Sequence, residues 1–350
     1  MTRRPCPYGS HRSLEPAGSL PQPAWRIDNC PDIAPNELLI RVDTLNVDAA
    51  SFTQLEKAAE EKGGSVEDNM AAAILDIVAR RGKLHNPVTG SGGMLLGTVE
   101  RVGPEHPAAG SLQPGIRIAT LVSLSLTPLK LERIRQVNLD RDQVEVDGRA
   151  VLFASGIYAP IPTDLPETLA LAVLDVAGAP AQTARLVRPG DSVLVIGAGG
   201  KSGLLCLHEA RKRAGVTGRL YAMAHSPASV ERAASLGISD AVFAAGADRP
   251  LEALAAFHAV SGGEAADVTI NCVNVPGTEM TSVLCTREGG TVYFFSMATS
   301  FTAAALGAEG IGRDVNMIIG NGYARGHDLI ALACLRENSR LKEIFESWFV

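Results

Sequence analysis

The spacing of apolar residues changes character near position 165. Before that point, short apolar runs alternate with turns that contain glycine, proline and aspartate, which is typical of an irregular, mostly antiparallel β domain. The stretch 53–81 differs, because it is rich in alanine, glutamate and lysine and its second half has helical spacing. We expect a helical hairpin there, broken at Gly63-Gly64 and inserted into the β domain. The strands predicted for this part of the chain cover 38–42, 96–102, 116–122 and 150–153.

After position 165 the pattern becomes a regular alternation of strands and helices. A helix is predicted over 169–176, and the all-apolar run 193–196 is typical of a strand buried on both faces of a parallel sheet. Strand–helix alternation with short loops predicts a doubly wound parallel sheet and an α/β fold. The further predicted strands are 220–224, 241–243, 268–271, 291–295 and 317–319; the predicted helices are 202–214, 228–236, 251–260 and 278–285, and the amphipathic segments 329–336 and 341–349 follow.

A glycine-rich turn joins the first buried strand to the next helix. It reads Gly197-Ala198-Gly199-Gly200-Lys201-Ser202-Gly203, and its glycines fit a GxxGxxG register, since Ser202 stands where a strict GxGxxG has its third glycine. In a Rossmann domain such glycines allow a tight turn, close approach of a pyrophosphate, and close packing of the helix. The turn is therefore predicted to bind a dinucleotide through 197, 199, 200, 201, 202 and 203, with Lys201 neutralising the pyrophosphate. A glycine turn without a ligand is the alternative.

The end of the second strand bears on the choice of cofactor. An acid at this place would bind the adenosine ribose and repel a 2′-phosphate, but the chain reads Ala224-His225-Ser226. Because His225, Ser226 and Arg232 would tolerate a phosphate, NAD is expected and NADP stays open. Further predicted cofactor contacts follow the later strands, with local turn bonding as the alternative for the polar ones: Asn271, Val273, Phe295 and Ser296, with Asn274 and Ser91 as polar neighbours of the nicotinamide end.

Composition narrows the class of protein. The chain has 350 residues, 46% of them hydrophobic and 20% charged, with a formal net charge of −6; at about 150 residues per domain this suggests two domains. An acidic chain without a long apolar stretch is not expected to bind nucleic acid or a membrane. The start, which includes Arg3 and Arg4, has no apolar region typical of a signal peptide, and the six cysteines lack zinc-site spacing. A cytoplasmic location and no metal are expected.

The arrangement of a β domain before a nucleotide-binding domain resembles the medium-chain dehydrogenase/reductase superfamily. This resemblance implies a GroES-like β domain over 1–165, with the helical insertion at about 53–81 and completed by 322–350, and a Rossmann domain over 166–321. Where zinc-dependent members place Gly-His-Glu, this chain has Gly90-Ser91-Gly92-Gly93-Met94. The catalytic zinc is therefore expected to be absent.

A closer resemblance covers essentially the whole chain and points to the L-erythro-3,5-diaminohexanoate dehydrogenase family. It implies a reversible, NAD(P)-dependent oxidative deamination that gives 5-amino-3-oxohexanoate and ammonia in lysine fermentation. The phrases that carry it are long and specific: Tyr8-Gly9-Ser10-His11-Arg12, and the segments 20–23, 44–54, 85–94, 119–128, 174–183, 197–203, 273–280, 293–301 and 319–323.

Oxidative deamination without a metal requires protein groups that remove protons and activate water. Asp175 is the first candidate, as the only charge in an apolar helix, where a substrate ammonium would compensate a buried carboxylate. Asp48 is second, in the loop that carries the first active-site group in zinc-dependent relatives, and His85 is a possible proton shuttle near neutral pH. A structural ion pair or helix cap, an Asx turn and an ordinary surface histidine are the respective alternatives.

Three interpretations of function remain at this point. The leading one is an NAD(P)-dependent dehydrogenase that acts on the amino group of a small diamino acid. A zinc-free quinone or enoyl reductase is the second, and its apolar substrates would not require Asp48 and Asp175. A non-catalytic nucleotide-binding protein is the third. The superfamily resemblance implies a homodimer or higher homo-oligomer.

Overall fold

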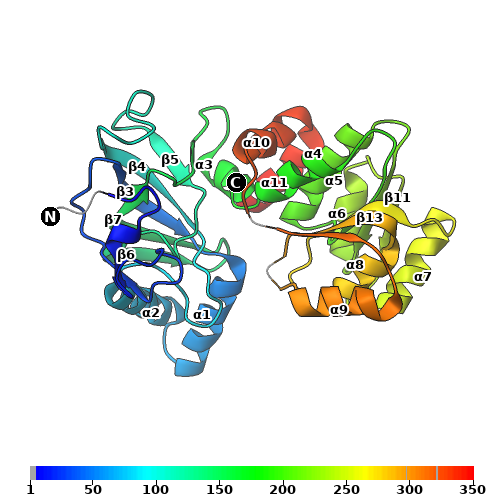
Figure 1. Cartoon of the computed structure of the whole chain (residues 1–350), viewed down its shortest axis with the longest axis horizontal. Coiled ribbons are helices and arrows are strands. Elements are labelled where there is room, and N and C mark those ends of the chain that lie inside the picture. The colour runs from blue at the N-terminus through cyan, green and yellow to red at the C-terminus, as the bar shows by residue number, and fades with distance from the viewer. Residues whose placement is uncertain (1–4, 297, 321) are drawn as a thin grey trace. The chain divides into compact units, whose positions relative to one another are not determined.

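The computed structural model describes residues 5–296, 298–320 and 322–350. Residues 1–4, which belong to the stretch considered above as a possible signal peptide, lie outside the described residues. Met297 and Asn321, which belong to two of the segments that carry the family resemblance, also lie outside them. The chain divides into two compact units, Met1–Glu167 and Thr168–Val350 (Figure 1). The division falls close to the predicted boundary at 165, but it places 322–350 in the second unit instead of the first.

The first unit is built on a six-stranded antiparallel sheet with the order β6-β7-β3-β4-β5-β8. All four predicted strands are present; β3, β4 and β7 are longer than expected and β5 is shorter, whereas the highly charged β6 and the short β8 were not predicted. The strands are β3 (Glu37–Asn46), β4 (Met94–Val102), β5 (Arg117–Thr120), β6 (Leu129–Asn138), β7 (Gln143–Phe153) and β8 (Tyr158–Pro160), preceded by the one-turn helix η1 (Ser10–Arg12) and the small pair β1 (Ser13–Glu15) and β2 (Arg26–Ile27).

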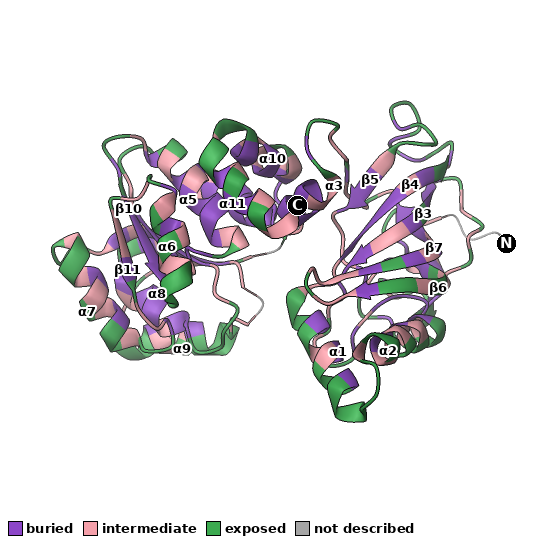
Figure 2. Cartoon of the chain, turned by 180° about the vertical axis from the view of Figure 1, so that it is seen from behind, coloured by how far each residue is buried: buried purple, intermediate pink, exposed green. Residues whose placement is uncertain are grey.

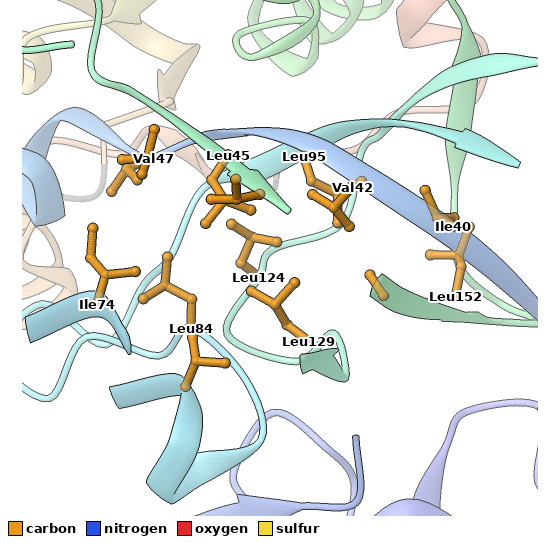
Figure 3. Close-up of a cluster of buried hydrophobic side chains, with 14 of the residues drawn as sticks. Ile40, Val42, Leu45, Val47, Ile74, Leu84, Leu95, Leu124, Leu129 and Leu152 are labelled. Carbon is orange, nitrogen blue, oxygen red and sulfur yellow. The ribbon is translucent and has the colours of Figure 1, made fainter. Parts of the chain in front are cut away.

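The predicted helical hairpin is confirmed as α1 (Ala49–Lys62) and α2 (Val66–Arg81). The break lies at Gly63 and Gly64, whose φ angles of 74° and 85° are costly for residues with a side chain. The hairpin buries an apolar face against the sheet, with Ile74 of α2 in the same core as Val42 and Leu45 of β3 (Figure 3). The α1–α2 hairpin is thus an integral part of the first unit's core.

The second unit contains a six-stranded parallel sheet of order β11-β10-β9-β12-β13-β14. In chain order this is 3-2-1-4-5-6, the strand order of a doubly wound dinucleotide-binding domain. Figure 2 shows strands of this sheet buried, while its helices expose their outer faces. The strands are β9 (Ser192–Ile196), β10 (Arg219–Ala224), β11 (Ala241–Ala244), β12 (Ala266–Asn271), β13 (Thr286–Phe294) and β14 (Asn316–Ile319).

Every helix predicted for the second unit is present. The unit contains two further helices, α4 and α9, that were not predicted. The C-terminal helices belong to this unit because α10 packs on α4 and α5, and α11 packs on α5 and α10. Gly178 at the start of α4 also lies so close to Gly322 that a Cβ would meet its carbonyl carbon at 2.8 Å. The helices are α3 (Glu167–Leu174), α4 (Gly178–Leu186), α5 (Lys201–Ala214), α6 (Pro227–Ser235), α7 (Pro250–Ser261), α8 (Glu279–Cys285), α9 (Phe301–Ile311), α10 (His327–Glu337) and α11 (Ser339–Phe349).

No helix in the described part of the chain combines the length and the apolar character needed to cross a bilayer.

A buried ion pair fixes the N-terminal segment to the first unit. The carboxylate of Glu37 accepts hydrogen bonds from Nε and Nη2 of Arg12, both at 2.7 Å, from His11 at 2.8 Å and from the amide of Ala34 at 2.8 Å. Arg12 donates in addition to backbone carbonyls of the segment 28–32. Burial alone would raise the pKa of Glu37, but the hydrogen bonds from Arg12 and His11 outweigh it and lower the pKa to about 2.

We expect Glu37→Gln to lower the free energy of unfolding by about 3–5 kcal/mol, because it leaves the buried Arg12 guanidinium with only the exposed Asp28 carboxylate, 3.7 Å away, as a counter-charge. Since the pKa of Glu37 is lower in the folded than in the unfolded chain, the stabilisation is present above about pH 4.5 and is lost as the pH falls toward about 2. Urea unfolding of wild type and variant between pH 3 and 7 measures both effects. As a control, Asp147→Asn removes the solvent-accessible pairs of Asp147 with Arg133 and Arg135 and should cost at most about 1 kcal/mol. Equal stability losses for the two variants would contradict the assignment.

Candidate functional site

The predicted cofactor residues of the second unit gather at one edge of its sheet. The parallel register pairs Ile196 at the end of β9 with Met223 of β10 and with Asn271 at the end of β12, and Asn271 in turn pairs with Phe294 of β13. The residues that follow these strand ends therefore lie side by side: Gly197, His225, Val273 and Phe295. Strands β9 and β12 are neighbours although five elements (α5, β10, α6, β11 and α7) separate them in the chain, and ligands of such sheets bind at this reversal of strand order.

The glycine turn between β9 and α5 has the geometry of a phosphate-binding loop. Gly197 has a φ of 81°, and a Cβ on Gly203 would lie 2.2 Å from the carbonyl oxygen of Gly197, so only glycine permits this packing. Gly200 is exposed at the N-cap of α5, and a Cβ there would meet nothing closer than 3.6 Å. Backbone amides at the start of α5, including those of Lys201 and Ser202, have no partner within the helix, and this favours binding of an anion. These residues fit a dinucleotide pyrophosphate.

Gly199 has a different role from the one that its place in the motif suggests. A Cβ at this position would lie 2.2 Å from the carbonyl oxygen of Ser229 in α6, so Gly199 allows the turn to pack against that helix. Its own carbonyl accepts a hydrogen bond from Nε of Arg232 at 3.1 Å. The turn and the start of α6 thus form one packed unit.

The end of β10 presents hydroxyls and a guanidinium and no acid. Ser226 caps α6, since its hydroxyl accepts from the amide of Ser229 at 3.2 Å, and Arg232 donates to the hydroxyl of Ser229 at 3.0 Å. His225 is exposed beside them. Among the residues that the structure describes, no carboxylate lies within ion-pair distance of Arg232. The hydroxyls and the guanidinium of this group fit a 2′-phosphate.

Asp175 and Lys201 form an ion pair at the start of α5. The Lys201 ammonium lies 3.0 Å from Oδ2 of Asp175 and 5.7 Å from the centre of the Phe349 ring. The side chains of Asp175 and Lys201 are 20% and 32% exposed, so both remain accessible to a ligand. The sequence had left open a structural ion pair for Asp175, and the structure supplies the cation of that pair.

The polar residues after β12 and β13 are largely engaged within the unit. The amide of Asn271 is buried and donates to the hydroxyls of Thr278 and Ser282, both at 2.9 Å, and its oxygen accepts from the amide of Val273. Val273 lies against the glycine turn, because a Cβ on Gly197 would meet its Cγ2 at 2.9 Å. Asn271 therefore stabilises the backbone and side chains at this edge of the sheet through internal hydrogen bonds. A direct contact of Asn271 with the cofactor stays a prediction.

At the end of β13, the hydroxyl of Ser296 donates to Oδ1 of Asn274 at 3.4 Å and accepts from the amide of Ala298. The amide of Phe295 donates to the carbonyl of Asn271. The structure thus brings Asn274, Phe295 and Ser296 together, as the sequence predicted, and their contacts with a nicotinamide stay predictions.

The first unit has a separate polar cluster at the start of α1. Asp48 is the N-cap of this helix, with Oδ1 accepting from the amide of Ser51 at 3.0 Å, while Oδ2 is buried and has no hydrogen-bond partner among the described residues. The hydroxyls of Ser51 and Thr89 are 2.5 Å apart, and the amide of Asn86 donates to Gln54 of α1. A buried carboxylate oxygen without a donor is costly, so Oδ2 is suited to receive one from a ligand.

The segment that replaces the Gly-His-Glu of zinc-dependent relatives passes close to Asp48. A Cβ on Gly93 would lie 2.1 Å from the carbonyl oxygen of Asn46 and 2.7 Å from the amide nitrogen of Asp48, and a Cβ on Gly92 would lie 2.2 Å from the carbonyl oxygen of Leu84. These glycines are thus required by packing. Ser91 is tied into the same loop, with its carbonyl accepting from the amide of Asn86 at 2.9 Å.

His85 lies in the same loop but in an environment that opposes its charged form. Its Nδ1 is buried and has no hydrogen-bond partner in the described part of the chain, and burial, helped by the charges of Arg81 and Lys83, lowers the pKa of His85 to about 4. At neutral pH this imidazole is neutral, so the environment does not favour the proton transfer near neutral pH that the sequence suggested. Any catalytic role of His85 stays a prediction.

The described residues contain no group of three or more histidine, cysteine, aspartate or glutamate side chains placed to hold a metal ion. The six cysteines are free thiols, and the sulfur atoms of buried Cys206 and partly buried Cys272 lie 3.9 Å apart.

Sequence reasoning missed several residues of the site in the second unit. Ser229 and the aromatic residues Trp348 and Phe349 lie beside the glycine turn or its cations, but Trp348 and Phe349 are far from the turn in sequence and have no motif of their own. Arg232 was noted only for its charge, and its bond to the turn could not be inferred from spacing.

The fold of the chain is that of solved dehydrogenases and reductases of the medium-chain type. It aligns with an alcohol dehydrogenase from Thermus sp. ATN1 with a TM-score of 0.53 and 20% identity, covering 91% of this chain and 87% of that one. A mycobacterial quinone oxidoreductase aligns with a TM-score of 0.52 and 17% identity, covering 94% and 87%. At this level of identity the likeness shows the fold alone.

Curated relatives are much closer in sequence. A profile described as the L-erythro-3,5-diaminohexanoate dehydrogenase N-terminal domain matches residues 11–162. An L-erythro-3,5-diaminohexanoate dehydrogenase from Acetoanaerobium sticklandii is 56% identical over 345 residues, covering 99% of each chain. A second, from Fusobacterium nucleatum subsp. nucleatum, is 52% identical over 350 residues, covering 99% of this chain and 100% of the relative. Identity at this level over the whole length shows that the chain is an oxidoreductase that belongs to the L-erythro-3,5-diaminohexanoate dehydrogenase family.

Proposed function

We propose that the enzyme catalyses the reversible, NAD(P)-dependent oxidative deamination of L-erythro-3,5-diaminohexanoate to 5-amino-3-oxohexanoate in lysine fermentation. The substrate ammonium, water and NAD(P)⁺ are converted to a ketone, ammonium, NAD(P)H and one proton. The observation that carries the proposal is the extent of identity, over half of the residues along the full length, with relatives named for this activity. The dinucleotide-binding geometry of the glycine turn supports it.

The cofactor supplies one part of the chemistry, because a bound nicotinamide ring takes up the hydride from the carbon that bears the amine. The residues of the chain must hold a substrate with two ammonium groups, accept a proton from the reacting one, and position the attacking water. A carboxylate is the natural group for the first two tasks.

Asp175 is the proposed proton acceptor in the second unit. Its carboxylate is held by Lys201 at 3.0 Å, next to the turn that is proposed to bind the cofactor, and it is partly exposed. Lys201 restricts the orientation of the carboxylate and at the same time adds a positive charge at the start of α5. Oδ2 of Asp175 is engaged by this pair, and the second oxygen remains for the substrate.

Asp48 is the proposed site for a substrate ammonium in the first unit. The support is that its two oxygens differ: Oδ1 caps α1, whereas Oδ2 is buried and receives no hydrogen bond from any described residue. An ammonium donor would satisfy Oδ2 and form a charge-assisted hydrogen bond, which is stronger than a bond between neutral groups.

Both nicotinamide cofactors are proposed to bind. The support is the group of Ser226, Ser229 and Arg232 beside the end of β10, together with the absence of an acid from the strand end itself, which reads Ala224-His225-Ser226.

The activity is tested directly by the absorbance of the reduced nicotinamide. Purified protein with L-erythro-3,5-diaminohexanoate should reduce both NAD and NADP, in metal-free buffer and equally in the presence of EDTA. A rate that disappears on chelation and returns with zinc would contradict the proposed metal independence. No reduction with either cofactor, together with oxidation of NADPH by quinones or enoyl compounds, would replace this proposal by the reductase alternative.

Asp48→Asn is expected to lower kcat/KM for the diamino acid by about 10- to 100-fold, because a charged hydrogen bond contributes about 1.5–3 kcal/mol. Asparagine is as good an N-cap as aspartate, so the melting temperature should change little. The matched control is Ser65→Asn, which exchanges the cap of α2 and should leave both activity and stability near wild type. An Asp48→Asn enzyme with unchanged kcat/KM would remove Asp48 from substrate binding.

Asp175→Asn is expected to lower kcat by about 100-fold or more, since a positioned general base contributes about 10²–10⁴-fold. The dissociation constant of NADH, measured by titration calorimetry, should change less, because the glycine turn is intact. Wild-type kcat and KM would exclude Asp175 from the chemistry. Loss of NADH binding with an unchanged kcat at saturating cofactor would assign Asp175 to positioning Lys201 only.

A further inference from the structure

Helix α11 ends beside the glycine turn. Two aromatic rings near the end of this helix contact two cations that lie next to the turn. The guanidinium carbon of Arg232 lies 5.0 Å from the centre of the Trp348 ring, and the ammonium of Lys201 lies 5.7 Å from the centre of the Phe349 ring. Both distances are within the range of a cation–π contact. These two cations flank the turn, since Lys201 opens α5 and Arg232 binds the carbonyl of Gly199.

The two rings are held by the core of the unit. Phe345 is fully buried, and its ring centre lies 5.7 Å from that of Trp348 and 6.1 Å from that of Phe349. Trp348 and Phe349 pack edge to face, with centres 6.0 Å apart. The indole therefore offers Arg232 a surface whose position is fixed by α11.

Three contacts together determine where the Arg232 guanidinium points. Nε donates to the carbonyl of Gly199, Nη2 donates to the hydroxyl of Ser229, and the guanidinium carbon lies over the indole ring of Trp348. Two of its five N–H donors are used in these bonds, which leaves three for a ligand. No carboxylate among the described residues pairs with this cation.

An uncompensated guanidinium at the carboxyl end of the second strand is suited to an anion of the adenosine half of a dinucleotide. The 2′-phosphate of NADP is the group that distinguishes this cofactor from NAD at that position. Arginine binds phosphate through a planar fork, so the orientation of the fork affects the binding strength. Trp348 restricts this orientation without contacting the phosphate itself.

We propose that Trp348 is a positioning residue for the 2′-phosphate of NADP(H): it holds the Arg232 guanidinium against the glycine turn, and α11 thereby determines how well the enzyme accepts NADP(H) relative to NAD(H). The inference rests on the proposed function in one respect, namely that the glycine turn binds a nicotinamide dinucleotide.

The test compares the dissociation constants of NADPH and NADH by titration calorimetry, with no substrate present. Trp348→Leu should weaken NADPH binding about five- to tenfold and NADH binding less than about twofold, in keeping with the strength of a partly exposed cation–π contact. Trp348→Phe, which keeps a ring, should restore most of the NADPH affinity. Trp25→Leu replaces the only other tryptophan, 49% exposed in the first unit, and should change neither constant.

A double substitution separates positioning from a merely structural role. Arg232→Gln should weaken NADPH binding selectively, and Trp348→Leu added to it should have no further effect, because the indole acts through the guanidinium. Equal losses for NADPH and NADH, no loss for either, or additive losses in the double variant would overturn the inference. If Trp348→Leu does not fold, as judged by circular dichroism, Trp348→Phe carries the test with an expected loss of about twofold for NADPH alone. A wild-type protein that binds neither dinucleotide would refute the proposed function itself, and with it this inference.

Discussion

Helix α5 can approach strand β9 only because position 203 carries no side chain. A Cβ on Gly203 would lie 2.2 Å from the carbonyl oxygen of Gly197 and 2.7 Å from the Cα of Ala198. This close approach sets the distance between the end of the strand and the first turn of the helix. The accessible amides of that turn, the Asp175–Lys201 pair and the contacts of α6 with Gly199 all depend on it. Any side chain at position 203 would push α5 away from β9 and so disrupt the accessible amides, the ion pair and the α6 contacts named above.

The second unit could be predicted well from the sequence because its parallel strands are buried on both faces and so appear as uninterrupted apolar runs. Helix α9 was missed for the opposite reason, as Phe301, Leu306 and Ile311 are apolar but exposed and obscure any amphipathic pattern. In the first unit, β6 was missed because most of its residues are charged or polar and only Leu129 and Val137 are buried. The superfamily resemblance implied that 322–350 completes the first unit. The segment belongs to the second unit instead, because α10 packs on α4 and α5.

The candidate site was predictable only where its chemistry is local in sequence. The glycine turn is a contiguous motif, and its helix follows at once. The contacts of Arg232 with Trp348 and of Lys201 with Phe349 join residues more than a hundred positions apart, and only the packing of α11 brings them together. Asp48 could be named because it lies in the loop that carries the first active-site group in zinc-dependent relatives. The sequence cannot show that one of its oxygens caps α1 and that the other has no donor among the described residues.

The packing of Gly199 against α6 has a consequence for the evolution and engineering of cofactor use. Its missing side chain makes room for the backbone of Ser229, its carbonyl binds Arg232, and Arg232 binds the hydroxyl of Ser229. The steric constraint runs from the turn to the helix, because a side chain at position 199 would displace the backbone of Ser229 and with it the hydroxyl that orients Arg232. Any variant of the turn at position 199 therefore changes the phosphate loop and α6 at once, and an engineered library must vary the turn and α6 together.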